Sequence, residues 1–261
     1  MGQITRKGSL SKFENIRRRI RTYKTWYKII FPFNRIFRGV QHMRLRNGKS
    51  AYVRSVRSMD VNIISDVLGG NEYDLEQLRL PPHATIVDLG GNIGTFAMEM
   101  HRLFPTADII SYEPYPANCE MFTMNAPYAM LVQKAASGKT CSVQLEDTSN
   151  YVGLRVVEKG GIKVEAESLD DILKDFVKVD LLKIDIEGSE YEVLNNASTG
   201  TLKKVDRILM ETHDVPGFDD LEWAEQILTK HGFTVSWIDK LGIVYGERHA
   251  TEVRAAPERA R

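Results

Sequence analysis

The stretch that decides the fold lies at residues 84–94 and reads Ala84-Thr-Ile-Val-Asp88-Leu-Gly90-Gly91-Asn92-Ile-Gly94. Its apolar start predicts a short buried strand over 84–88, and its glycines predict a tight turn into a helix over 93–104. The glycine spacing differs from G-x-G-x-x-G, the pattern that seats a dinucleotide pyrophosphate on a helix N-terminus. Asp88 stands directly before the glycines, where its carboxylate would repel a pyrophosphate and attract a cationic ligand.

Strands and helices alternate from this stretch onward, which predicts a parallel sheet with helices on both faces, a doubly wound, Rossmann-like α/β fold. Strands are expected over 84–88, 108–112, 130–133, 179–184, 207–210, 233–237 and 243–245, with less regular strands over 141–145 and 162–166. Helices are expected over 93–104, 116–125, 168–176, 190–195 and 221–231. The last two strands lie too close in sequence for a helical crossover, so they must pair as a terminal antiparallel hairpin.

Residues at the ends of the first strands are candidates for binding a cofactor, because ligands of doubly wound sheets lie beyond the carboxyl ends of the strands. The carboxylate of Asp88 suits the positively charged methionine end of S-adenosylmethionine, and Glu113 is placed to accept both hydrogens of a ribose diol. The expected cofactor-binding residues are Asp88, Gly90, Gly91, Asn92, Gly94, Glu113, Pro114, Ala135, Ala136 and Asp185, with the two alanines near an adenine. An ordinary capped turn with a surface acid, in which Asn92 only forms the turn, is the alternative.

A second cluster of charged residues ends the strand over 179–184 and the strand after it. It comprises Lys183, Asp185, Glu187 and Glu190, joined by Glu211 and His213. Because like charges repel in a cleft, such a cluster is typical of a catalytic site. Asp185 or His213 is expected to be the general base, and Glu187 and Glu211 are expected to orient substrate hydroxyls. Lys183 is included among the catalytic candidates, and a solvated strand–helix loop is the alternative.

These motifs resemble those of the FkbM family of methyltransferases over about residues 44–247. The shared stretches are D-L-G-G-N-I-G, E-P-Y-P-A-N, S-L-D-D-I-L, D-L-L-K-I-D-I-E-G-S-E and E-T-H, with an R-N-G hairpin upstream. The resemblance implies an S-adenosylmethionine-dependent O-methyltransferase of a sugar, glycan or polyketide-like hydroxyl. A parallel sheet finished by an antiparallel hairpin is also the arrangement of class I methyltransferases.

Several other functions stay open. They are an N-methyltransferase, a nicotinamide-dependent oxidoreductase, and a non-catalytic lipid- or RNA-binding module. The motif of exocyclic amine methylation, Asn/Asp-Pro-Pro-Tyr, is replaced here by Asp185-Ile-Glu187-Gly188. A Mg²⁺ ion bound by Asp185 and Glu211 is an alternative that the sequence does not favour, so no metal is assigned.

The N-terminal part is strongly basic, although the 261-residue chain is formally neutral. Residues 1–49 hold 14 Lys or Arg against one acidic residue, Glu14. Residues 10–30 predict a helix ended or kinked by Pro32, with Tyr23, Trp26 and Tyr27 on an aromatic side. We expect this arm to contact an anionic membrane that carries a lipid-linked glycan acceptor. Packing of the aromatic residues against the domain is the alternative, and nucleic-acid binding is less expected because no base-reading motif is present.

The arm is followed by a predicted hairpin and a short helix. Asn47-Gly48 predicts a type I′ turn between strands at 43–45 and 51–53, and Asp60 is expected to cap a helix that ends at Gly69-Gly70. The chain therefore divides into a basic aromatic arm (1–40), a hairpin and helix cap (41–83), a cofactor-binding catalytic domain (84–249) and a flexible tail (250–261).

Composition points to a reducing compartment, because two cysteines, Cys119 and Cys141, cannot form a disulfide framework. No signal peptide is recognised, and the apolar run over 26–33 is too short to span a bilayer. A cytoplasmic location is expected, with peripheral attachment to the inner face of a membrane as a variant.

Overall fold

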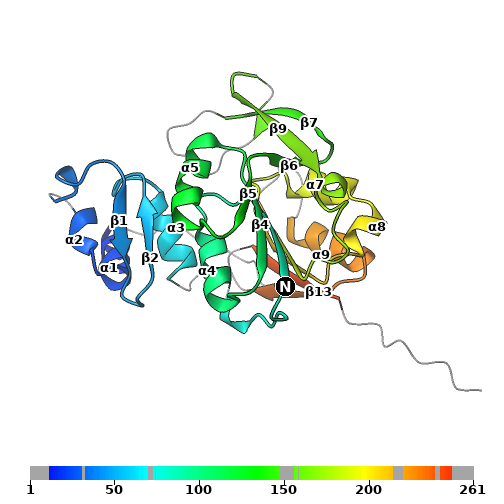
Figure 1. Cartoon of the computed structure of the whole chain (residues 1–261), viewed down its shortest axis with the longest axis horizontal. Coiled ribbons are helices and arrows are strands. Elements are labelled where there is room, and N and C mark those ends of the chain that lie inside the picture. Colours follow the sequence, from blue (N-terminus) through cyan, green and yellow to red (C-terminus); the bar gives the residue numbers. More distant parts are fainter. Residues whose placement is uncertain are drawn as a thin grey trace, which may run out of the picture.

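A computed structural model describes residues 12–30, 33–69, 73, 75–146, 156–157, 159–213, 220–238 and 242–248 (Figure 1). Pro32, Gly70 and the tail over 250–261 lie outside the described residues, and so do the features predicted for them. Among the described residues, no helix is both long and apolar enough to cross a membrane.

A seven-stranded sheet forms the centre of the molecule, as the alternation of strands and helices predicts. Its strands are β3 (Thr85–Leu89), β4 (Asp108–Tyr112), β5 (Met130–Val132), β10 (Leu181–Ile184), β11 (Arg207–Glu211), β12 (Thr234–Ile238) and β13 (Ile243–Glu247). They lie in the order β12-β13-β11-β10-β3-β4-β5. Strand β13 runs antiparallel to both of its neighbours, and the remaining pairs are parallel. The predicted terminal hairpin is therefore confirmed, with its second strand inserted between the first and β11.

Helices cover both faces of this sheet, because successive strand residues point to opposite sides. Ile86 and Leu181 face one hydrophobic core, whereas Val87 and Leu182 face the other. The first core is shared with α3 (Asp60–Val67), α4 (Thr95–Leu103) and α5 (Pro116–Asn125). The second is shared with α6 (Leu169–Ile172), α7 (Glu190–Asn196), α8 (Thr199–Leu202) and α9 (Asp220–Lys230).

A second, four-stranded sheet lies above the carboxyl side of the main sheet in Figure 1 and was not expected as a separate unit. It contains β6 (Ala135–Ser137), β7 (Cys141–Leu145), β8 (Val156–Val157) and β9 (Ile162–Ser168), in the order β6-β9-β7-β8. The Ser168 hydroxyl accepts a hydrogen bond from the Asp171 N–H and caps α6, which begins within the helix expected over 168–176. That helix ends at Ile172, four residues before the expected Phe176.

The N-terminal elements pack on α3 and α5 through a short hairpin. They are α1 (Lys12–Thr22), α2 (Trp26–Ile29), the 3₁₀ turn η1 (Phe33–Arg35), β1 (Gln41–Arg44) and β2 (Ser50–Val53), with a second 3₁₀ turn, η2 (Leu75–Gln77), after α3. The prediction of one helix over 10–30 is wrong, because the chain leaves the helix at Tyr23, which forms an isolated bridge with Leu45. The Tyr23 ring is fully buried and its hydroxyl donates to the Val61 carbonyl, so tertiary packing overrides the helical pattern there.

The predicted hairpin is confirmed, but the predicted type I′ turn is wrong. The Leu45 N–H donates to the Lys49 carbonyl, and the Gly48 N–H donates to the Leu45 carbonyl, so the turn proper comprises the three residues 46–48 between Leu45 and Lys49. Gly48 has φ +90°, while Asn47 is not among the described residues with positive φ, as a type I′ turn would require. The Asn47 amide instead donates to the Leu68 carbonyl, which ties the turn to the end of α3.

Asp60 does not cap α3, contrary to expectation. Met59 occupies the N-cap position, and the fully buried Asp60 carboxylate accepts hydrogen bonds from the backbone and guanidinium of Arg54. Burying a carboxylate without a charged partner costs more free energy than leaving the first turn of a helix uncapped.

Candidate active site

The glycine loop between β3 and α4 is shaped by the neighbouring strand. The Gly90 and Gly91 N–H groups both donate to the Tyr112 carbonyl, at 2.9 Å each. Gly90 has φ +87°, and a Cβ atom there would overlap the backbone carbonyl oxygen of Asp185. Gly90 is therefore required by the close approach of β3 to the end of β10, in addition to any ligand.

Helix α5 packs closely against Gly91 and Gly94, so these two positions also leave little room for a side chain. A Cβ on Gly91 would meet the Phe122 ring and Ser111 at 3.1 Å, and one on Gly94 would meet Phe122 at 3.2 Å. Gly94 also has φ +86°. Both positions serve close helix packing, whereas the sequence had suggested close approach to a ligand.

Glu113 lies at the end of β4 and is held by three donors. Its Oε2 accepts from the Asn92 N–H at 2.8 Å, and its Oε1 accepts from the Tyr115 N–H and the Asn118 amide. Burial raises the pKa of Glu113, although the hydrogen bonds from Tyr115 and Asn92 offset part of this effect. Among the described residues, Oε2 has one donor, which leaves it one further lone pair for a ligand hydroxyl.

A first cavity is lined by Glu113, and we call it the cofactor cavity. Most of the expected cofactor residues line it, namely Gly90, Asn92, Glu113, Pro114, Ala135, Ala136 and Asp185. Its described lining also includes Glu187, so three of these residues are acidic and none is basic. Such a wall favours a cationic ligand over a pyrophosphate.

Asp88 does not line this cavity, and its expected contact with the cofactor is therefore not supported. The side chain is fully buried, accepts a 2.8 Å hydrogen bond from the Ser111 hydroxyl and lies 3.2 Å from the Lys183 ammonium. The parallel register sets Asp88 beside Ser111 on β4 and beside Lys183 on β10. The cation that meets the Asp88 carboxylate thus belongs to the protein itself.

Lys183 connects Asp88 to the charged cluster at the end of β10. Its ammonium lies 3.3 Å from Asp185 Oδ2 and donates to the Gly90 carbonyl at 2.8 Å. Burial alone would lower the pKa of Lys183, but the charges of Asp185 and Asp88 raise it above the ordinary lysine value. Lys183 is therefore a fixed cation that positions Asp185 and the glycine loop.

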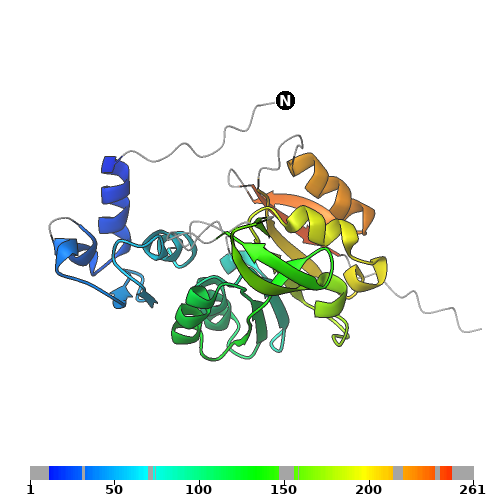
Figure 2. The same cartoon turned by 90° about the horizontal axis from the view of Figure 1, so that it is seen from above.

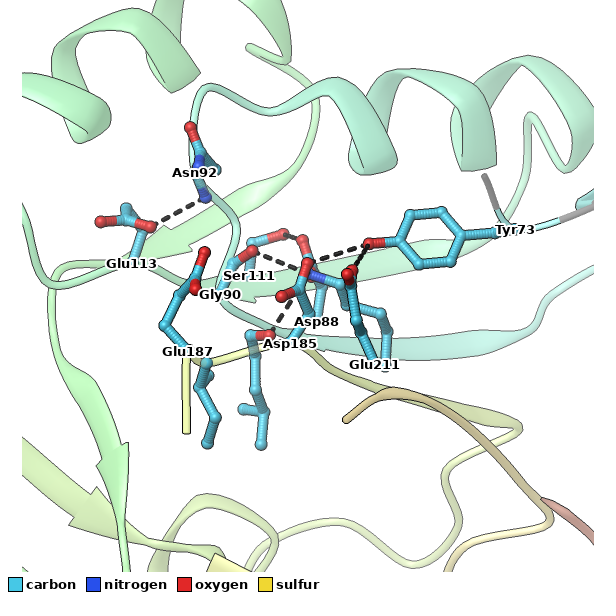
Figure 3. A network of polar contacts seen from close by, with 12 residues as sticks. Tyr73, Asp88, Gly90, Asn92, Ser111, Glu113, Asp185, Glu187 and Glu211 are labelled. Atoms are coloured by element: carbon cyan, nitrogen blue, oxygen red, sulfur yellow. Dashed lines mark hydrogen bonds and ion pairs between the residues drawn. The ribbon is translucent and has the colours of Figure 1, made fainter. Parts of the chain in front are cut away.

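Asp185 and Glu211 face each other across a tyrosine hydroxyl, as Figure 3 shows. Tyr73 Oη donates to Asp185 Oδ2 at 2.9 Å and lies 3.5 Å from Glu211 Oε2. Burial would raise the pKa of Asp185, but the charges of Lys183 and His213 and the Tyr73 hydrogen bond lower it. In contrast, burial and then the charge of Asp185 raise the pKa of Glu211 to about 7. The two carboxyl groups therefore differ in the ease with which they bind a proton.

His213 is held among carboxylates. Its Nδ1 lies 2.9 Å from Glu190 Oε1, and its Nε2 lies 3.3 Å from Glu187 Oε2 and 3.9 Å from Asp185 Oδ1. Burial opposes its charge, but the hydrogen bond and charge of Glu190 raise the pKa of His213 to about 9. A histidine that is protonated at pH 7 is a poor proton acceptor, which disfavours the expected role of His213 as base.

Glu190 organises the turn after β10. Its two carboxylate oxygens accept from the Ile186 and Gly188 N–H groups, each at 2.9 Å. These bonds hold Glu187 in a left-handed conformation, φ +56°, and Gly188 at φ +103°. Glu190 therefore has a structural role, and it presents Glu187 and His213 to the cluster.

A second cavity also borders Asp185, and we call it the acceptor cavity. It shares Gly90, Asn92, Asp185 and Glu187 with the cofactor cavity. Its lining also includes Lys183, Glu211, His213 and Gly91, which the sequence had already singled out. The remaining lining residues were missed by sequence reasoning, namely Met59, Asn62, Ile63, Asp66, Val67, Tyr73, Thr95 and Phe96. Most of these come from α3 and α4, which the sequence identified as helices without indicating that they face the site.

One group of described side chains is arranged to hold a metal ion. Asp185, Glu211 and His213 each offer a ligand atom, and these atoms lie within 4.8 Å of one another. Two of the three donors are carboxylate oxygens, which suit Mg²⁺, but the Lys183 ammonium already neutralises Asp185. The geometry therefore allows a divalent ion without requiring one.

The sheet order, the terminal hairpin and the glycine loop at the end of β3 together define a class I methyltransferase fold. The profile of the methyltransferase FkbM domain matches residues 88–245, and the chain belongs to this family. The resemblance inferred from the sequence is thereby confirmed.

Curated relatives agree with this assignment. "Methyltransferase 1" of Beauveria bassiana (strain ARSEF 2860) is 26% identical over 229 residues, which cover 76% of this chain and 90% of the relative. The 31-O-demethyl-FK506 methyltransferase FkbM of Streptomyces tacrolimicus is 25% identical over 237 residues, which cover 75% of this chain and 90% of the relative. Among solved structures, methyltransferase FkbM from Methylobacillus flagellatus KT aligns with a TM-score of 0.47 at 18% identity, over 66% of this chain and 45% of that chain.

Proposed function

We propose that this methyltransferase uses S-adenosylmethionine to methylate a hydroxyl of a sugar, glycan or polyketide-like natural product. The observation that carries the proposal is the meeting of two cavities at Gly90, Asn92, Asp185 and Glu187. One cavity has an acidic wall suited to a cationic cofactor, and the other holds a half-buried cluster of carboxylates suited to hydroxyl groups. Methyl transfer needs donor and acceptor in contact, which this junction provides.

The residues of the cofactor cavity fit S-adenosylmethionine. Glu113 would accept a ribose hydroxyl, Ala135 and Ala136 would pack against the adenine, and Asp185 and Glu187 would face the cationic end. When bound, this cofactor supplies a methyl group attached to a positively charged sulfur atom. The acidic wall disfavours a nicotinamide dinucleotide, whose pyrophosphate requires positive charge or free N–H groups.

The residues of the acceptor cavity would orient the hydroxyl and take its proton. Tyr73 and Glu187 would align it, and alignment alone contributes on the order of 7–11 kcal/mol at best. We assign the proton to Glu211, because its pKa of about 7 makes it the better acceptor, while Asp185 keeps its charge. O-methylation is further supported by the relative whose name states that it methylates 31-O-demethyl-FK506.

The cofactor assignment predicts that the purified protein binds S-adenosylhomocysteine and that Glu113→Gln weakens this binding. Loss of a hydrogen bond to a charged group costs about 1.5–3 kcal/mol, or roughly tenfold to hundredfold in Kd. Isothermal titration calorimetry measures it, with Glu165→Gln, an exposed acid on β9, as the matched control. Binding of NADH without binding of S-adenosylhomocysteine would contradict the proposal.

The proton assignment predicts a pH profile. Since Glu211 must be ionised to act as a base, kcat/KM should fall about tenfold per pH unit below about pH 7 and level off above it. Glu211→Gln should remove this limb and lower the rate about 10²–10⁴-fold. A limb near pH 7 that survives in Glu211→Gln would show that Glu211 is not the base. Loss of activity with EDTA, restored by Mg²⁺, would instead assign Asp185, Glu211 and His213 to a metal ion.

A further inference from the structure

One end of the molecule carries exposed apolar and basic side chains side by side. They lie on residues 24–30 and 33–40, which follow α1, include α2 and η1, and precede β1. The exposed members are Lys24, Tyr27, Phe33, Arg35, Ile36, Arg38 and Val40, and we call them the basic–apolar tip. In Figure 1, α2 lies at the opposite end of the molecule from α8 and α9, and in Figure 2 the same blue segment projects from the domain.

The apolar members of the tip are unusually accessible. Ile36 is 73% exposed, Phe33 50%, Val40 48% and Tyr27 43%. Single exposed apolar residues are common, but four of them within fourteen residues are a local concentration, and gathered exposed apolar side chains typically mark an interaction site.

The rest of the segment fixes the shape of the tip. Trp26 and Phe37 are partly buried and pack against the hydrophobic core. Lys28 Nζ lies within hydrogen-bond distance of Gln41 Oε1, at 3.5 Å, and over the Phe37 ring, at 5.3 Å. The alternative in which the aromatic residues pack against the domain therefore holds in part. Trp26 and Phe37 anchor the segment, whereas Tyr27 and Phe33 are exposed.

The charge of this region has one sign. Between Glu14 and Asp60 the sequence holds 13 Lys or Arg and no acidic residue. Several of these cations pair with acids of the main domain, as Arg18 does with Asp66, Lys49 with Glu99 and Arg54 with Asp60. At the tip itself, Lys24, Arg35 and Arg38 are exposed next to the apolar patch.

We propose that the basic–apolar tip docks on the surface of an anionic lipid bilayer. Phe33, Ile36 and Val40 would enter the boundary between headgroups and acyl chains, and the arginines would lie at lipid phosphates. A membrane is favoured over a nucleic acid because the most exposed apolar side chain of the tip, Ile36, is aliphatic and offers no face on which bases stack. The docking goes beyond the proposed reaction and does not depend on it.

Co-sedimentation of the full chain with vesicles tests the docking. We expect binding to phosphatidylcholine vesicles that contain phosphatidylglycerol, little binding to pure phosphatidylcholine, and weaker binding at high salt. Arg35→Ser with Arg38→Ser should weaken the partition coefficient about thirtyfold, at about fivefold for each charge. Phe33→Ser with Ile36→Ser should weaken it about tenfold or more, and this loss should persist at high salt.

Matched controls come from the opposite end of the molecule. Lys174→Ser with Lys203→Ser removes two exposed charges near α6 and α8, and Val177→Ser removes an apolar side chain that is 94% exposed. Both controls should bind like wild type, and unchanged circular dichroism should show that every variant is folded. The proposal is overturned if the wild-type protein does not bind anionic vesicles, or if the control variants weaken vesicle binding as much as the tip variants do. It is also overturned if the tip variants bind vesicles like wild type and lose only binding to RNA.

Discussion

Gly90→Ala is expected to destabilise the protein by about 2–5 kcal/mol and to abolish binding of S-adenosylhomocysteine. Two costs add at this position. The left-handed backbone, φ +87°, strains an alanine by about 1–2 kcal/mol. The new methyl group would also overlap the Asp185 carbonyl oxygen, so β3 and β10 must separate at their carboxyl ends. Since Gly90 lines both cavities, that separation would disrupt the junction between them.

Gly160→Ala separates these two costs. Gly160 has nearly the same backbone conformation, φ +84°, but a Cβ atom there meets nothing within 4 Å. It should lose only the strain, about 1–2 kcal/mol, and bind S-adenosylhomocysteine normally. Urea denaturation and calorimetry measure both variants. Equal stability of the two variants would show that the end of β10 can move away from residue 90 at little cost. This result would contradict the inference that the close approach of β3 to the end of β10 requires a glycine at position 90.

The fold was predictable because its signals are local. The Gly90 loop, the apolar strand before it and the spacing of later strands are all visible within short windows, and they fix a doubly wound sheet with a terminal hairpin. Where distant residues compete, local signals failed. Tyr23 sits in a helical pattern but leaves the helix to be buried against Val61 and Leu45, which lie more than twenty residues away.

The site was predictable to the level of residue types at strand ends. The register between neighbouring strands decides which charged side chains become partners. This register cannot be read from a single sequence. Asp88 and Lys183 are 95 positions apart, and only the pairing of β3 with β10 sets them side by side. The proton affinities of His213 and Glu211 follow from such neighbours. Tyr73 carried no signal at all, because a lone tyrosine between helices matches no motif.

Asp185→Asn is expected to lower kcat about 10²-fold or more while changing the Kd of S-adenosylhomocysteine less than tenfold. Asp185 borders both cavities, accepts from Tyr73 and keeps the pKa of Glu211 high through its charge. The neutral amide would weaken the hydrogen bond from Tyr73 and the pairing with Lys183, and so misplace the acceptor, and a shift of about 1 Å can cost 10²-fold. Because Glu211 would become more acidic, the acid limb of the pH profile should also move to lower pH.

Asp180→Asn is the matched control, because it lies just before the amino end of strand β10, away from the cavities. Its buried carboxylate accepts from the Thr85 N–H at 2.9 Å and pairs with Lys178 at 2.8 Å. Asp180→Asn should therefore cost stability, about 1–3 kcal/mol, and leave kcat and the pH profile unchanged. If Asp185→Asn keeps wild-type turnover on the true acceptor, the junction of the two cavities is not where the methyl group is transferred. A fall in kcat without any move of the acid limb would leave Asp185 as an aligning residue only, and would mean that its charge does not set the pKa of the base.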